Sequence, residues 1–299
     1  MDNFQEESDD DCAALDFGET TSSPTPRMNE HLPFLRAIAA NPADDLPRLI
    51  FADFLEESGE PDSIARAHFI RAQIALVELP PRSPEFRETK ALQNRLFEMY
   101  SEDWIWDLPE QRHAEGNPAW RRGFIEFVRM TWEDFVRDAE LFETVPITRV
   151  QTFRAGHNHG ITVVELDRTP HLERITHLQI GPSMRPDALD SDNPESDGIL
   201  KVLLVSRGFR ALSHLDLSAN NINNANLIEF VLRLPEAAFA ETLRSLDLSE
   251  LYGLDDAIGN VLATARGLES LERLNLKQTQ LAEPVRVVLR QRFGDRVQF

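Results

Sequence analysis

Two histidines one residue apart are the clearest candidates for metal chemistry in this sequence. His157 and His159 flank Asn158 and precede Gly160, so a loop could present both imidazoles to one ion. Metal sites in proteins usually need a third ligand, and no distant group of Cys, His or Glu supplies one at a recognisable spacing. We therefore expect a polar loop without a bound metal. A metal-dependent hydrolase built on this loop is the less favoured alternative.

Two further histidines and two aspartates stand at matching places in a repeated pattern. His177 and His214 hold the same position in neighbouring copies, so their imidazoles could lie side by side. Asp216 and Asp247 hold the next outward position. A catalytic role for the histidines would need a nucleophile or an acid placed beside them, and the sequence announces none. We therefore expect no catalytic residue in this group.

Asp53, Glu56 and Glu57 form a cluster of carboxylates that could do acid–base chemistry. Asp53 and Glu57 are four residues apart on a predicted helix, where they can pair with Arg or Lys of neighbouring helices, and this interpretation is favoured. The sequence contains no phosphate-binding loop, nucleophile elbow, dinucleotide fingerprint or zinc-knuckle spacing. We therefore expect a protein without enzymatic activity and without a cofactor.

The elements that must position these groups follow from a pattern of apolar residues that returns five or six times. It consists of an apolar residue, two free positions, a second apolar residue, one free position and a third, as in Leu212, Leu215 and Leu217. Residues two apart on a strand point the same way, so the last two apolar residues should point inward and the residues between them outward. Five copies, spaced by 28, 37, 31 and 28 residues, begin at Ile147, Ile175, Leu212, Leu243 and Leu271, and a weaker copy begins at Ile125.

Segments with helical periodicity separate these copies, so one unit is predicted to run as strand, turn, helix and return. The spacing resembles that of ribonuclease-inhibitor-like leucine-rich repeats. The resemblance implies an α/β fold, in which a parallel sheet and outer helices form a short curved solenoid. A polar insertion over residues 182 to 196 is expected to form an exposed loop before a helix near residues 197 to 206. We expect strands at residues 126 to 130, 149 to 152, 177 to 180, 214 to 217, 245 to 248 and 273 to 276, and helices at 226 to 234, 256 to 265 and 283 to 293.

The composition indicates which classes of partner are disfavoured and which cellular compartment is expected. The chain has 31 basic and 51 acidic residues, a net charge of −20 that argues against contact with nucleic acid or anionic membrane. The single cysteine, Cys12, cannot form an internal disulfide. The sequence shows no basic, apolar leader and no run of 18 apolar residues, so we expect a cytoplasmic protein. Residues 1 to 27 carry eight acidic side chains and are expected to be a disordered tail.

A second resemblance lies N-terminal to the repeats. Residues 41 to 61, followed by 66 to 73, closely resemble the bacterial repeat-companion domain, a helical module that precedes leucine-rich or other repeats. One departure is Phe54, where that family's pattern has tryptophan. Trp104, Trp106 and Trp120 are expected to pack in a seam between the helices and the first strand. The implied domains are a disordered acidic tail (1–27), an α-helical repeat-companion module (28–118) and a leucine-rich-repeat domain of about five to six repeats including caps (119–299).

Leucine-rich repeats usually bind other proteins, so we expect a monomeric, non-enzymatic scaffold that binds a partner protein on the concave face of the sheet. Regulation of a partner enzyme, by inhibition or activation, is the alternative. The outward side chains of the predicted strands are the candidate contacts: Arg149, Gln151, His177, Gln179, His214, Asp216, Ser245, Asp247, Arg273, Asn275 and Lys277.

Overall fold

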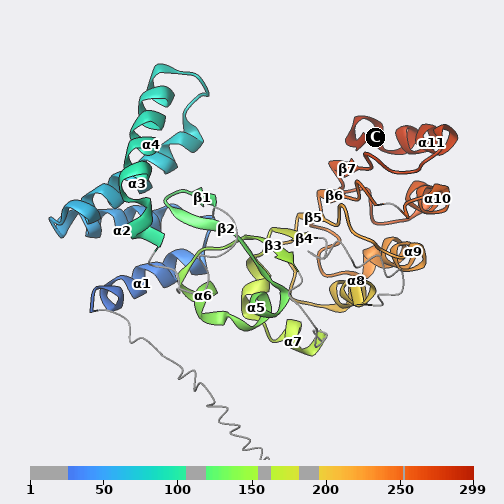
Figure 1. The fold of residues 1–299 in the computed structure, drawn as a ribbon, viewed down its shortest axis with the longest axis horizontal. Coiled ribbons are helices and arrows are strands. Elements are labelled where there is room, and N and C mark those ends of the chain that lie inside the picture. Colours follow the sequence, from blue (N-terminus) through green and yellow to red (C-terminus); the bar gives the residue numbers. More distant parts are fainter. Residues whose placement is uncertain (1–25, 106–118, 154–162, 182–194, 252) are drawn as a thin grey trace, which may run out of the picture.

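A computed structural model describes residues 26–105, 119–153, 163–181, 195–251 and 253–299 of the chain. The described part is an α/β structure in which a mostly parallel, open sheet follows four N-terminal helices. The strands lie along the inner side of an arc and the later helices along its outer side (Figure 1). Residues 1 to 25 of the predicted disordered tail, the His157 and His159 loop, and most of the predicted loop at residues 182 to 196 lie outside the described residues. The last two residues of the predicted tail, Pro26 and Arg27, are instead the first residues of a helix, so the predicted tail is two residues too long.

The N-terminal helices begin and end at residues whose backbone preferences explain the boundaries. The Asp44 carboxylate accepts a hydrogen bond from the Leu46 amide at 3.0 Å at the start of the second helix. Gly59 follows the end of that helix with φ of 72°, a left-handed conformation that a glycine adopts without steric cost. Pro61 then opens the third helix, where its missing N–H leaves no bond unmade. The helices are α1 (Pro26–Ala40), α2 (Leu46–Glu57), α3 (Pro61–Glu78) and α4 (Pro84–Ile105).

The sheet has eight strands whose spatial order is their order in the sequence. The first pair is antiparallel, and every later pair is parallel. All six predicted strands are present in one parallel arrangement, which confirms that prediction, although three of them end one residue early. The strands are β1 (Ala119–Arg121), β2 (Phe124–Thr131), β3 (Arg149–Phe153), β4 (His177–Ile180), β5 (His214–Asp216), β6 (Ser245–Asp247), β7 (Arg273–Asn275) and β8 (Val297–Gln298).

The repeated apolar positions form the core beneath the sheet. Leu215, Leu246 and Leu274 pair directly across neighbouring strands. These three leucines, and the leucines two residues after each of them, are at most 1% exposed, as the alternation of a strand requires. The inward direction of the pattern is therefore confirmed.

The turns after three successive strands share one backbone geometry. Ala219, Glu250 and Gln278 have positive φ angles of 56°, 58° and 56°. Such angles are unfavourable for residues with a Cβ atom, so each turn needs compensating contacts. The Ala219 amide donates to the Ser249 carbonyl at 3.0 Å, and the Glu250 amide donates to the Lys277 carbonyl at 2.9 Å. Neighbouring turns thus hold one another in the same strained shape.

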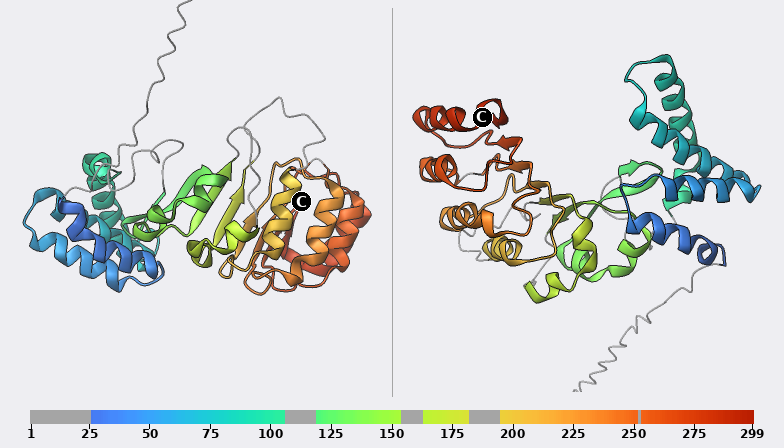
Figure 2. Two further views of the ribbon diagram at one scale, coloured as in Figure 1. Left: turned by 90° about the horizontal axis from the view of Figure 1, so that it is seen from below. Right: turned by 180° about the vertical axis from the view of Figure 1, so that it is seen from behind.

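The outer helices follow the predicted order, and those from α8 onward lie side by side (Figure 2). Helix α9 begins two residues earlier than predicted, because the Asn223 side chain accepts from the Ala225 amide at 2.8 Å and caps it. The helix expected after the polar insertion is present as α8. The helices of this part are α5 (Trp132–Arg137), α6 (Ala139–Thr144), α7 (Val163–Asp167), α8 (Glu195–Val205), α9 (Asn224–Arg233), α10 (Asp256–Thr264) and α11 (Glu283–Phe293).

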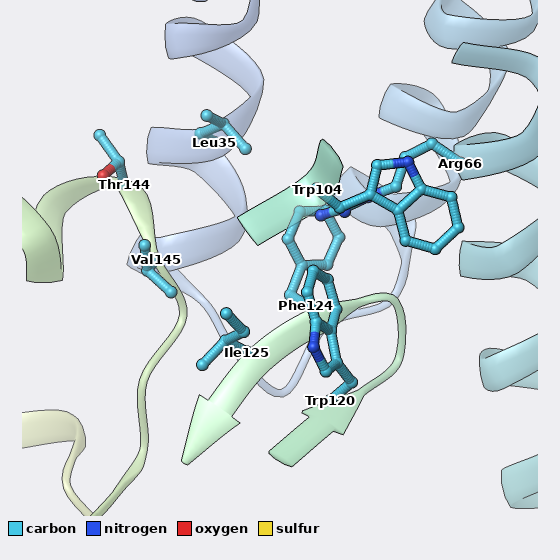
Figure 3. Close-up of a pocket in the computed structure, with 8 residues that line it drawn as sticks. All are labelled: Leu35, Arg66, Trp104, Trp120, Phe124, Ile125, Thr144 and Val145. Carbon is cyan, nitrogen blue, oxygen red and sulfur yellow. The ribbon is translucent and has the colours of Figure 1, made fainter. Parts of the chain in front are cut away.

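Aromatic packing joins the N-terminal helices to the first hairpin of the sheet. Trp104 and Trp120 pack around Phe69, with ring centroids 4.8 and 5.8 Å from the Phe69 ring. The buried Arg66 guanidinium lies 5.0 Å from the Trp104 ring centroid and 4.7 Å from that of Trp120 (Figure 3). This confirms the predicted seam for two of the three tryptophans, whereas Trp106 lies outside the described residues.

A glycine in the first hairpin allows the helices to approach the sheet closely. Gly123 has φ of 86°, and a Cβ atom added there would lie 2.4 Å from Cγ1 of Ile70 on α3. Its amide donates to the side-chain oxygen of Gln73 at 2.7 Å. Any other residue at position 123 would force α3 away from the hairpin.

No helix among the described residues is long and apolar enough to span a lipid bilayer.

A buried histidine should make the protein sensitive to mild acid. His171 is 6% exposed, its ring stacks on Phe142 with centroids 3.8 Å apart, and its Nε2–H donates to the Phe135 carbonyl at 2.7 Å. Burial lowers the pKa of His171 from 6.5 to about 4. The unfolded chain therefore binds more protons than the folded protein between these values, so stability is lost as the pH falls from 6.5 toward 4. We expect this residue to contribute a loss of about 3 kcal/mol across that interval.

The measurement is urea unfolding of the parent and of His171→Phe at several pH values. Phenylalanine keeps the ring stack but cannot take up a proton, so the difference between the two unfolding free energies isolates the histidine. A difference that does not change with pH would show that His171 does not titrate as its burial predicts.

Candidate interaction surface

The side chains on the side of the sheet opposite the leucine core form two rows that cross the strands in register, and we call these two rows the outward face. The pairing of β2 to β8 aligns one residue of each strand with the next, which produces the rows directly. Ten of the eleven predicted contacts lie in these rows, and Lys277 is exposed just after β7. The first row is Phe127, Arg149, His177, His214, Ser245 and Arg273, and the second is Arg129, Gln151, Gln179, Asp216, Asp247, Asn275 and Gln298.

Three members of the rows and one neighbouring arginine were not among the predicted contacts. Phe127 and Arg129 fill the outward positions of the weak apolar copy at Ile125, so the spacing held a signal for both. Gln298 lies on β8, which lacks the pattern, and only its pairing with Asn275 reveals it. Arg121 lies on β1, which pairs antiparallel to β2, and the pattern of the parallel strands says nothing about it.

His177 and His214 stack on one another at the centre of the first row. Their ring centroids are 3.9 Å apart and the ring planes differ by 8°. The residue before each histidine contacts its ring nitrogen Nδ1, with Thr176 Oγ1 at 2.9 Å and Ser213 Oγ at 2.8 Å. The two rings are therefore held in place from behind and are available to solvent at the opposite nitrogen. The predicted side-by-side arrangement is confirmed.

The hydrogen bonds behind the rings assign their tautomer. Each hydroxyl also contacts a backbone carbonyl, which can only accept: Thr176 Oγ1 lies 3.2 Å from the Thr148 oxygen, and Ser213 Oγ lies 3.1 Å from the Thr176 oxygen. A hydroxyl has one proton, so both of its contacts are satisfied only when the imidazole Nδ1–H donates to it. His177 and His214 thus carry the proton on Nδ1 and present Nε2 as a hydrogen-bond acceptor.

The surroundings keep both histidines neutral. Desolvation is the main cause that lowers the pKa of His177 to about 4, and the positive charges of Arg149 and Arg121 lower it further. Desolvation likewise lowers the pKa of His214, with Arg149 again contributing. At neutral pH the pair therefore offers two uncharged acceptors beside positively charged arginines.

The polar residues of the second row on β5 to β7 are engaged by the chain itself. Asp216 accepts from the Ser218 amide at 2.8 Å, and Asp247 accepts from the Ser249 amide at 3.0 Å. The second oxygen of Asp247 accepts from the Asn275 side chain at 2.8 Å. Asn275 is only 7% exposed, so its visible role is to support this turn. These carboxylates shape the turns after their strands, and partner contact by them stays a prediction.

The carboxylate cluster of α2 is a surface ion-pair network. Arg71 of α3 binds Asp53 at 2.6 Å and Glu56 at 2.7 Å. The predicted pairing with a neighbouring helix is confirmed for Asp53, whereas the second partner is Glu56 and not Glu57. Hydrogen bonding to Arg71 lowers the pKa of Glu56, so the group is held ionised. Two carboxylates paired to one guanidinium suit a surface contact better than proton transfer.

Metal binding finds no support in the part of the chain that the structure describes. No group of three or more His, Cys, Asp or Glu side chains there could hold an ion. The His157 and His159 pair lies outside that part, so the prediction about its loop stays untested.

Comparison with known proteins yields no relative: neither a scan of protein-family models nor a search of curated proteins finds a match to this sequence.

Proposed function

We propose that this chain is a bacterial leucine-rich-repeat protein that binds a partner protein on the outward face and performs no catalysis. In this proposal residues 28–118 form the repeat-companion module, and residues 119–299 form a short curved solenoid whose concave side is the outward face. The observation that supports it most is the pair of rows, polar apart from Phe127, that are aligned in register across β2 to β8. Such rows form a continuous surface that no single strand could supply.

Two features support the repeat architecture. The left-handed turn residues Ala219, Glu250 and Gln278 are 31 and 28 residues apart, the same spacing as the apolar copies at Leu212, Leu243 and Leu271. Stacked units share their core and their turn hydrogen bonds, since no single unit can bury its own apolar face.

Rigidity supports binding as the function. The strands are fixed by pairing on both sides, and His177 and His214 are fixed further by stacking and by their Nδ1 bonds. A partner that docks on side chains already held in one conformation loses less entropy than one that must order them.

The contact between Ser213 and His214, beside the outward face, favours binding over catalysis. Ser213 Oγ lies 2.8 Å from Nδ1 of His214, a distance that also occurs between a nucleophile and its base. The serine proton is directed to the Thr176 carbonyl at 3.1 Å, however, and the imidazole donates to the serine. A hydroxyl that receives a proton from the ring is not activated by it.

The test reverses two charges on the outward face. Arg149→Glu combined with Arg273→Glu is expected to abolish the recovery of specific partners from an extract of the source cells, measured by affinity capture and quantitative mass spectrometry. The fold should persist, because the Arg149 guanidinium makes no ion pair with any described residue and the Arg273 contact to Gln298 is long at 3.4 Å and exposed.

The matched control is Arg168→Glu combined with Arg266→Glu, which changes the net charge equally at exposed positions outside the rows. Circular dichroism and melting curves should be alike for the parent and both variants. Equal recovery of every partner by the folded outward-face variant would rule out this face as the binding surface.

A further inference from the structure

We propose that the end of the outward face formed by β1 to β5 docks an acidic, extended peptide segment of the partner protein. This inference rests on the proposed function, since it specifies the chemistry of the partner at the same face. The residues that carry it are Arg121, Phe127, Arg149, His177 and His214.

This end of the outward face is basic, whereas the chain as a whole is acidic. The chain carries a net charge of −20, yet the charged side chains of the rows on β2 to β4 are arginines, and Arg121 of β1 adds a third. The nearest carboxylates of the rows, Asp216 and Asp247, already accept hydrogen bonds from the turns that follow their strands. The carboxylates of the rows are thus engaged internally, and Glu272, which acts electrostatically on His214, is paired with Arg244 at 3.8 Å. Arg121, Arg129 and Arg149 gather on β1 to β3, whereas Arg273 and Lys277 are the basic residues near β7.

Arg121 and Arg149 have guanidinium groups that lack an acceptor among the described residues. Within the described part of the chain, the guanidinium of neither Arg121 nor Arg149 forms a hydrogen bond or an ion pair, and Nε of Arg149 is buried without an acceptor. A guanidinium stays charged at any physiological pH, so leaving a buried donor unmatched is unfavourable. Both arginines lie close enough to His177 to lower its pKa, which places them around one spot. The terminal nitrogens of Arg149 are not among the buried atoms, so a carboxylate from outside can reach them and bind the guanidinium through two hydrogen bonds.

A peptide fits this surface better than a bare anion as the source of that carboxylate. The Nε2 atoms of His177 and His214 are acceptors, since the tautomer places the proton on Nδ1, and they would repel a bare anion placed against them. A peptide provides backbone N–H donors for these two nitrogens as well as side-chain carboxylates for Arg121 and Arg149. Phe127 adjoins Arg149 in the first row and adds an apolar contact. Nucleic acid has the anionic groups but no equivalent run of amide donors, and its dense charge is repelled by the rest of the chain.

The experiment uses the full chain and a fluorescein-labelled hexaglutamate peptide as the probe, with binding followed by fluorescence anisotropy. We expect the parent to bind this peptide, more weakly at about 300 mM than at about 50 mM salt, because charge attraction is screened. Arg149→Ala should weaken binding about tenfold, which corresponds to about 1.4 kcal/mol. Arg149→Lys should restore part of the affinity, since it keeps the charge but loses the two-bond geometry.

Two further comparisons guard against non-specific binding and misfolding. Arg266→Ala removes an exposed arginine outside the rows and should leave the affinity unchanged. Arg121→Ala tests the second guanidinium, so the proposal does not depend on the folding of one variant. No binding of hexaglutamate by the parent, or equal weakening by Arg266→Ala and Arg149→Ala, would overturn the proposal.

Further binding measurements compare other molecules that could occupy this surface. They also separate this inference from the proposed function. Tighter binding of a twelve-base-pair DNA duplex, or at least tenfold tighter binding of a synthetic peptide of residues 1–25 of this chain, would overturn the assignment of a partner's acidic segment. If the captured partners depend on the outward face but hexaglutamate does not compete with them, the proposed function stands and this inference fails. If hexaglutamate binds through Arg149 but no captured protein depends on the face, the proposed function fails instead.

Discussion

Glu126→Ala is expected to lower the free energy of unfolding by about 3 to 5 kcal/mol, because it removes the buried carboxylate partner of a buried guanidinium. The ion-pair partner that remains among the described residues is the partly exposed Asp45, 3.9 Å from Arg48 and 3.3 Å from Arg122. Glu126 is 2% exposed and lies between two arginines. Its Oε1 atom accepts from Arg48 at 3.2 Å and from Arg122 at 2.8 Å. Arg48 is fully buried, and burial together with the charge of Arg122 already lowers its pKa to about 10. Without the carboxylate the two guanidinium groups would repel one another at the junction of α2 and β2.

Urea unfolding at neutral pH measures this effect. Glu140→Ala is the matched control, because it removes an exposed glutamate from α6 and should change stability by less than about 0.5 kcal/mol. Glu126→Gln should fall between the two, since it keeps the volume and one acceptor but loses the charge. A loss below about 1 kcal/mol in Glu126→Ala would show that the arginines find other acceptors and that this cluster does not join the helices to the sheet.

Leu246→Ala is expected to destabilise the protein by about 2 to 5 kcal/mol, the range observed when a large apolar side chain is removed from a close-packed core. Leu246 is 0% exposed on β6 and pairs directly with Leu215 and Leu274 on either side. The cavity left by alanine would therefore be lined by rigid neighbours on paired strands, which cannot collapse into it. We expect the loss to appear as a lower urea midpoint and melting temperature.

Leu232→Ala provides the comparison for the leucine deletion. Leu232 lies on α9 and is 56% exposed, so its truncation removes little buried surface and should cost less than about 1 kcal/mol. Equal melting temperatures for the parent and Leu246→Ala would mean that the inward and outward positions of the strand are assigned the wrong way round.

The strands and their register could be predicted from the sequence because each depends on a local, repeated signal. Leucines at fixed spacing determine which side of a strand is buried, and equal spacing in successive copies aligns strands residue by residue. The juxtaposition of His177 and His214 follows from that alignment alone, and so do the two rows of the outward face. The strands β1 and β8 carry no such signal, because each pairs at an end of the sheet where the repeated pattern does not extend.

The hydrogen bonding of the outward face could not be predicted from the sequence, because it depends on the three-dimensional arrangement. The sequence places Thr176 and Ser213 before their histidines, but only the packed turns bring each hydroxyl to a carbonyl and so determine the tautomer. Asp216 and Arg149 are both outward by pattern, yet one is engaged by its own turn and the other is not. The pattern specifies direction, whereas hydrogen bonding decides which outward groups can bind a partner.

The sequence by itself determined the α/β class, the inward leucines and the order of the strands, because these depend on periodicity within about thirty residues. Only the tertiary structure decided how the helices meet the sheet. Glu126 and Arg48 are 78 residues apart and bear no fixed spacing to one another, and Gly123 meets Ile70 only after α3 has packed. A contact between distant segments depends on the sum of the packing around it, so no local pattern announces it. The same holds for Arg121, whose approach to His177 follows from the antiparallel return of β1.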